Sequence, residues 1–241
     1  MSKNFVPIKY TPKFVNTPNV RMFTSKMDAL GIGAGEGRLG LVFGRAGRGK
    51  TRTAQWYAAK EKCRYLRVVT VWSELDFLKG LCREVGVIDP PHRRGACFAE
   101  IIDKMVHDPR PVFVDELEKM NVRMLDLIRD LSDISTAPFV LIGEEELATV
   151  MKRNRRVWSR TFQTMEFQPI GVPDILMFCG DTTSITIEAD VAGLIHQYSD
   201  GDFRLVKRLV IALIQYANSM QNERITMEMA RTAIKASLSG E

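Results

Sequence analysis

Eight consecutive residues of this chain have the types and spacing that bind a phosphate chain. Residues 44–51 read Gly-Arg-Ala-Gly-Arg-Gly-Lys-Thr and fit the pattern G-x-x-x-x-G-K-[S/T]. In such a loop the glycines let backbone N–H groups curl around an anion, the lysine reaches the β- and γ-phosphates, and the last hydroxyl ligates Mg²⁺. We therefore predict a nucleotide-binding loop made of Gly44, Arg45, Ala46, Gly47, Arg48, Gly49, Lys50 and Thr51.

An acidic pair further along the chain indicates what happens to the nucleotide. Residues 111–114 are apolar and are followed directly by Asp115 and Glu116. A strand that ends in this way places Asp115 near the Mg²⁺ and Glu116 where it can polarise an attacking water. The pair favours hydrolysis over phosphoryl transfer to a small molecule. The chain has no N-K-x-D-like guanine signature, which argues against a GTP switch protein.

Two arginines could complete the site. Arg160 follows Ser159 shortly before a weak predicted strand, and Arg204 ends the stretch 201–204, Gly-Asp-Phe-Arg, at the start of an apolar helix. An arginine presented by a neighbouring subunit can stabilise charge on the γ-phosphate in the transition state, and one from a lid domain can sense that phosphate. Residue chemistry alone leaves a second interpretation open for both, that of a solvated surface arginine.

The composition sets limits on the class of protein. The 241 residues are 45% hydrophobic, and 34 basic against 29 acidic residues give a net charge of +5, which favours an anionic partner only modestly. The four cysteines are scattered without a C-x-x-C pair, and no apolar run has the length of a membrane span or of a signal peptide. These features predict a cytoplasmic protein with reduced thiols and no membrane partner.

Apolar runs alternate with helical patterns over the first two thirds of the chain. The alternation predicts an α/β fold with a parallel five-stranded sheet, and the helical patterns after residue 170 predict a small all-helical lid. The predicted strands are 39–43, 65–71, 112–114, 139–142 and 165–167. The predicted helices are 51–60, 75–85, 96–106, 121–131, 147–158, 174–179, 188–199, 203–220 and 226–236.

The chain before the first predicted strand contains three prolines. Pro7, Pro12 and Pro18 favour an extended N-terminal arm over residues 1–24, either disordered or, as its apolar residues favour, docked on a neighbouring surface. Residues 19–24 suggest a short strand or turn, and 25–30 a short helix. The predicted domains are this arm, a phosphate-loop α/β domain over 25–170 and a helical lid domain over 171–241.

Taken together, the loop, the acidic pair, Ser159-Arg160 and the stretch 201–204 resemble the AAA+ ATPases. Within them the chain resembles, over about residues 20–236, the transposition regulators of the Mu B, TnsC and IstB type. The resemblance implies ATP and Mg²⁺ as cofactors, with Asp115 supporting the metal and Glu116 as catalytic base. It makes Arg160 a finger that acts on the neighbouring subunit and Arg204 the lid arginine called sensor 2. Glu144 stands where the family has a small polar sensor 1 residue, so we expect slow hydrolysis.

The resemblance also implies partners. Members assemble as rings or helical filaments on double-stranded DNA, which they grip through its backbone, and they deliver that DNA to a transposase. Backbone binding requires lysine and arginine on one surface. The candidates are Lys79, Arg93, Arg94, Arg123, Lys152, Arg153, Arg155 and Arg156. For the run 152–156 the sequence leaves open DNA contact, a solvated helix, or arginines near a subunit interface.

Three other functions stay open at this stage. A helicase loader or replication initiator would share the nucleotide site and use the arm on a helicase or on single strands. A phosphotransferase would use the loop on a small substrate. A scaffold that binds ATP and barely hydrolyses it would explain Glu144.

Overall fold

The computed structural model describes residues 5–32, 38–184, 186–222 and 224–238. Its contacts divide into two compact units. The α/β unit comprises residues 19–45 and 49–167, and the helical unit comprises residues 1–18, 46–48 and 168–241. The arm and the middle of the phosphate loop therefore group with the helices of the C-terminal part.

The α/β unit is built on a sheet of five parallel strands in the order β2-β3-β4-β1-β5. The predicted α/β fold with a parallel five-stranded sheet is thus confirmed. The strands are β1 (Leu39–Phe43), β2 (Arg64–Arg67), β3 (Val112–Asp115), β4 (Phe139–Ile142) and β5 (Thr161–Glu166). We call the end where they begin the amino end of the sheet and the opposite end its carboxyl end.

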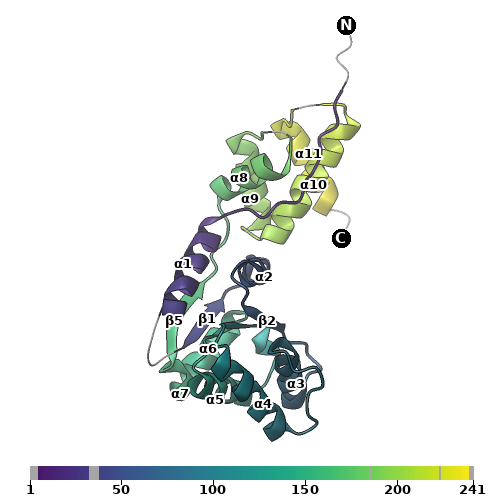
Figure 1. Ribbon diagram of the computed structural model, residues 1–241. Coiled ribbons are helices and arrows are strands. Elements are labelled where there is room, and N and C mark those ends of the chain that lie inside the picture. The colour runs from purple at the N-terminus through teal and green to yellow at the C-terminus, as the bar shows by residue number, and fades with distance from the viewer. Residues whose placement is uncertain (1–4, 33–37, 185, 223, 239–241) are drawn as a thin grey trace. The chain divides into compact units, whose positions relative to one another are not determined.

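Helices cover both faces of this sheet (Figure 1). Side chains along a strand alternate between its faces. In β4, Phe139 and Leu141 belong to one apolar core, whereas Val140 and Ile142 belong to the other. The first core includes residues of the helices α3 to α7, and the second includes residues of α1 and α2. The helical elements of this unit are α1 (Pro18–Ile32), α2 (Lys50–Lys60), α3 (Glu74–Glu84), α4 (Arg94–His107), η1 (Leu117–Lys119), α5 (Arg123–Ser135), α6 (Glu145–Arg153) and α7 (Arg155–Trp158).

The helical unit has a separate apolar core that the arm helps to fill. In Figure 1 the arm runs along α10, and Ile8 is only 4% exposed. The backbone N–H of Ile8 donates to Asn218 Oδ1 (2.8 Å), and the Asn218 amide donates back to the Ile8 carbonyl (3.0 Å). The docked alternative for the arm is therefore the correct one. The helices are α8 (Val172–Thr182), α9 (Ala189–Ser199), α10 (Phe203–Ser219) and α11 (Met227–Leu238).

Two sequence expectations are wrong in their bounds. The extended arm ends at Thr17 rather than at residue 24, because α1 runs continuously from Pro18. Proline is favourable at the first helical position, where its missing N–H costs nothing, so Pro18 starts a helix instead of preventing one. The single helix expected over 147–158 is two, because the Asn154 side chain accepts a bond from the Val157 N–H and begins α7.

The strand bounds also shift by a few residues. β2 is shorter than the predicted 65–71, and β5 begins earlier than the predicted 165–167. Three cysteines are buried and Cys63 is half-buried, and all four are free thiols. Among the residues that the structure describes, no helix has the length and apolar character needed to cross a bilayer.

Candidate nucleotide site

The phosphate loop leaves β1 at the carboxyl end of the sheet and has the backbone that anion binding requires. Three glycines of the loop have φ angles that residues other than glycine rarely adopt: 139° at Gly44, 78° at Gly47 and 96° at Gly49. A Cβ atom at Gly49 would meet nothing within 4 Å, so open space lies beside the loop there. Lys50 Nζ donates to the carbonyls of Gly44 and Arg45, which keeps the ammonium group over the loop. The loop therefore fits a polyphosphate at the start of α2.

The middle of the loop is held within the helical unit. The Gly47 carbonyl accepts a hydrogen bond from the Phe203 N–H (2.9 Å), and the buried Arg48 guanidinium lies 3.7 Å from the Asp200 carboxylate. A Cβ atom at Gly47 would lie 1.9 Å from Asp202 Oδ2, so only glycine fits there. Arg48, which the sequence placed among the nucleotide-binding residues, thus has an ion pair with Asp200 that the sequence did not reveal.

Asp115 ends β3 at the same end of the sheet, and both of its oxygens are engaged. Its side chain is 1% exposed, one oxygen accepts a bond from the Tyr65 hydroxyl (2.6 Å), and the other accepts one from the Glu116 N–H (2.9 Å). Burial, followed by the bond to Asp115, raises the pKa of Tyr65, so the phenol stays protonated and can donate. Tyr65 orients the predicted Mg²⁺ ligand. The sequence analysis did not identify Tyr65. Its position on β2, the strand that pairs with β3, was the signal that could have indicated it.

Glu116 follows with a backbone that few residues other than glycine adopt, at φ 59°. Its carboxylate forms ion pairs with Arg67, at the end of β2, and with Lys119, in η1. Burial raises the pKa of Glu116, but the bonds and charges of Lys119 and Arg67 outweigh burial and lower it overall. The carboxylate is therefore kept ionised, as a general base must be.

Arg160 lies at the amino end of the sheet, away from the phosphate loop. It directly precedes β5, and β5 pairs in parallel with β1 from Leu39↔Thr161 to Phe43↔Glu166. At 3.3 Å per residue, about 13 Å of strand separates this end from the start of the loop. Arg160 Nε donates instead to both oxygens of Asp133 (3.1 and 3.3 Å). Its placement disfavours any action on the nucleotide of its own chain.

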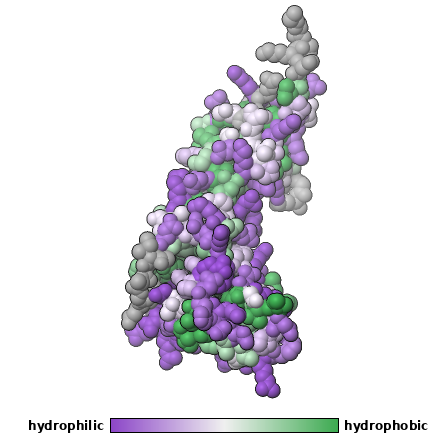
Figure 2. Space-filling model, in the orientation of Figure 1, coloured by the Kyte–Doolittle hydropathy of each residue, from purple (hydrophilic) through white to green (hydrophobic). Residues whose placement is uncertain are grey.

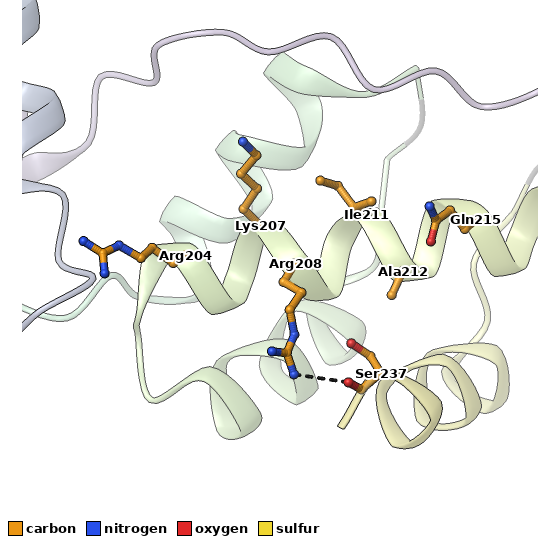
Figure 3. A pocket seen from close by; sticks show the side chains of 7 residues that line it. All are labelled: Arg204, Lys207, Arg208, Ile211, Ala212, Gln215 and Ser237. Atoms are coloured by element: carbon orange, nitrogen blue, oxygen red, sulfur yellow. Dashed lines mark hydrogen bonds between the residues drawn. The ribbon is translucent and has the colours of Figure 1, made fainter. Parts of the chain in front are cut away.

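Arg204 is the second residue of α10, and its side chain is exposed. It lines a surface pocket with Lys207 and Arg208 (Figure 3). The three cationic side chains point in different directions in that view, and Arg208 donates to the Ser237 carbonyl (3.1 Å). The pocket does not direct its cations at one anion, and the sensor 2 role of Arg204 stays a prediction.

The residue in the place of sensor 1 lies on the surface. β4 ends at Ile142, and Glu144 precedes α6 with an exposed side chain. The Glu118 carboxyl lies beside Gly143, the residue before Glu144, and burial raises the pKa of Glu118. A second acidic residue therefore lies beside the predicted position.

The DNA-binding candidates fall into two groups. Arg94 and Arg123 line a pocket of about 440 Å³ together with Glu74, Asp126 and Asp130, and Arg94 pairs with Glu74 at 2.6 Å. This mixed lining disfavours a phosphate there. Near it, Lys79 Nζ lies 3.1 Å from His92 Nδ1, and Arg93 precedes α4. The other group is exposed on α6 and α7 and consists of Lys152, Arg153, Arg155 and Arg156.

Comparison with known proteins agrees with this geometry. The family described as AAA domain matches residues 34–151. The Mu-like prophage FluMu DNA transposition protein B of Haemophilus influenzae is 25% identical over 166 residues, which cover 65% of this chain and 57% of that protein. Residues 34–151 of this chain therefore resemble the AAA domain. The predicted resemblance to regulators of the Mu B type is confirmed as well.

A second curated relative has a similar description. The ATP-dependent target DNA activator B of Escherichia phage Mu is 24% identical over 147 residues, covering 60% of this chain and 46% of that protein. The chain thus spans about half the length of these curated relatives.

Solved structures have the same fold as this chain. Cdc6p of Pyrobaculum aerophilum matches with a TM-score of 0.70 at 18% identity, covering 97% of this chain and 70% of that one. The RuvB Holliday junction branch migration motor of Thermotoga maritima matches with a TM-score of 0.61 at 18% identity, covering 92% and 70%. The AAA fold, with helices after the α/β core, is therefore shared.

Proposed function

We propose that this protein binds ATP with Mg²⁺, hydrolyses it slowly, assembles on double-stranded DNA without reading its sequence, and delivers that DNA to a transposase. The observation that carries the proposal is that the phosphate loop and the pair Asp115–Glu116 lie at the same end of one parallel sheet. The relatives' names, a DNA transposition protein and an ATP-dependent target DNA activator, support the choice of partners. The same names favour transposition over helicase loading.

Each residue of the site has a chemical task in this proposal. The glycine-rich backbone and the Lys50 ammonium would hold the phosphates, and Thr51 and Asp115 would hold the metal. Bound Mg²⁺–ATP supplies an electrophilic terminal phosphorus. Glu116, ionised by Arg67 and Lys119, orients a water and accepts its proton. Arg160 supplies its positive charge to the site of the neighbouring subunit.

The nucleotide part of the proposal is tested by binding. Lys50→Ala removes the cation that lies over the loop and should abolish saturable binding of a fluorescent ATP analogue. Lys60→Ala, in the last turn of the same helix, is the matched control and should bind as the unaltered protein does. Equal affinity of all three proteins for the analogue would rule out the loop as the site.

The assembly part is tested by sedimentation with ATP and random duplex DNA at low and high salt. Backbone binding predicts large complexes that are lost steeply as salt rises. Glu116→Gln should bind ATP, hydrolyse it far more slowly and remain assembled for longer. A protein that stays monomeric with ATP and duplex DNA at low salt would contradict the assembly, and normal turnover by Glu116→Gln would contradict the base.

A further inference from the structure

The two ends of α6 carry opposite charge. Four glutamates lie around its start, at the carboxyl end of the sheet, where α6 contacts η1: Glu118, Glu144, Glu145 and Glu146. We call them the acidic end. Five cations lie in its last turn and just after it, at the amino end of the sheet: Lys152, Arg153, Arg155, Arg156 and Arg160. We call them the basic end. Nine residues of helix place the two ends about 13 Å apart.

Large apolar side chains are exposed at the basic end. Binding to phosphate does not require such side chains. Trp158, Phe162 and Ile134 are 36%, 52% and 54% exposed. Ile134 follows Asp133, which bonds to Arg160, so α5, α7 and β5 meet at this point. Figure 2 shows hydrophobic patches among hydrophilic residues on one face of the α/β unit. Tryptophan, phenylalanine and arginine together are characteristic of protein–protein interfaces, whereas a DNA backbone requires cations alone.

We infer that the basic end of one copy of this protein binds the acidic end of the next copy, with Trp158 and Phe162 as apolar anchors. The charges are complementary, and they lie on opposite ends of one unit, so the contact joins unlike surfaces and can repeat from copy to copy. The run 152–156 then serves self-assembly rather than DNA. The inference rests on the proposed function in one respect, because Arg160 at the basic end would reach the neighbour's nucleotide.

Charge exchange tests the contact in the full chain with ATP and Mg²⁺, by mass photometry without DNA and with random duplex DNA. Arg155→Glu/Arg156→Glu lowers the charge of the five listed cations of the basic end from +5 to +1, and Glu145→Arg/Glu146→Arg raises the charge of the four glutamates of the acidic end from −4 to 0. Each double variant alone should need a concentration at least on the order of tenfold higher to assemble. A mixture of the two should assemble as the unaltered protein does. When the two variants alternate, the glutamates at 155 and 156 meet the arginines at 145 and 146, and each unaltered basic end meets an unaltered acidic end. A chain that carries all four changes should also assemble.

The controls separate this inference from other outcomes. Arg83→Glu, an exposed arginine on α3, should leave assembly unchanged. All variants should bind the ATP analogue with unchanged affinity, which shows that they are folded. Phe162→Ala should weaken assembly roughly tenfold, as loss of an interface anchor does.

Three results would overturn the inference, and they differ from failure of the proposed function. The first is unaltered assembly by both double variants. The second is failure of the mixture to recover. The third is assembly that persists while Arg155→Glu/Arg156→Glu loses DNA, which would assign the basic run to DNA instead. An unaltered protein that never assembles with ATP and DNA would remove the proposed function and this contact together.

Discussion

At the scale of single residues, the arrangement around Glu116 links charge to catalysis. The proposed base is ionised because two cations from different elements, Arg67 and Lys119, bond to its carboxylate. The sequence indicated Glu116 itself, since an apolar strand ending in Asp-Glu is a local pattern. It could not indicate Arg67, because only strand pairing brings that side chain opposite Asp115.

Removal of Arg67 should change the pH dependence of hydrolysis. Because Arg67 lowers the pKa of Glu116, Arg67→Ala should raise that pKa, and the acidic limb of the pH–rate profile should move to higher pH. The measurement is ATP turnover against pH, with Arg83→Ala as the control. A profile that falls in height without moving along the pH axis would indicate a merely structural role for Arg67.

Arg160 should act only between subunits. Arg160→Ala should bind ATP normally and lose activity by up to about 10³–10⁵-fold, because its charge would no longer reach the neighbour's nucleotide. In mixtures, a Lys50→Ala copy that cannot bind ATP should still supply Arg160 and restore turnover to the Arg160→Ala copies. Turnover in such mixtures is the readout. Mixtures no more active than the two variants measured separately would assign Arg160 to its Asp133 partner alone.

At the scale of elements, local signals determined what could be predicted. The cap of α3 could be predicted, because Ser73 is followed by Glu74 and Asp76 in the first turn of a helical pattern, and the structure has a capping box there. The break at Asn154 was not, since apolar spacing continues through it. The contacts of the middle of the phosphate loop could not be predicted either, because Arg48 forms its ion pair with Asp200, which is distant in the sequence.

The cap of α3 should have a measurable stability. Ser73→Ala removes the side chain that accepts the Asp76 N–H and should lower the free energy of unfolding by about 1 kcal/mol. Chemical denaturation followed by circular dichroism measures the change. Thr70→Ala, at an exposed position before the helix, should change stability by no more than about 0.5 kcal/mol. Equal stability of both variants would mean that water replaces the cap without cost.

At the scale of the whole molecule, the chain forms two compact units, and the N-terminal arm is part of the helical unit. Alternating strands and helices predicted the α/β core, and the shift to helices near residue 170 predicted the rest. The arm's place was only partly predictable. Its apolar residues indicated docking, but its hydrogen bonds to Asn218 join residues 210 positions apart.

The arm should stabilise the helical unit through one buried side chain. Ile8 is 4% exposed in the core of that unit, so Ile8→Ala should cost about 2–5 kcal/mol of its unfolding free energy. Val6, 66% exposed, is the matched control, and Val6→Ala should cost less than about 0.5 kcal/mol. Hydrogen exchange of amides in α8 to α11 reports on this unit. Unchanged protection in Ile8→Ala would show that the arm adds no stability.

The Asn218 side chain forms both of these hydrogen bonds with the backbone of Ile8, one with its N–H and one with its carbonyl. A carboxamide used in this way recognises an extended main chain and is indifferent to the side chains that the main chain carries. Substitutions at Lys9 or Val6 can therefore accumulate without loosening the attachment, whereas a proline at position 8 would remove the donated hydrogen and release it. The outer surface of the arm is thus free to diversify while its anchorage stays fixed.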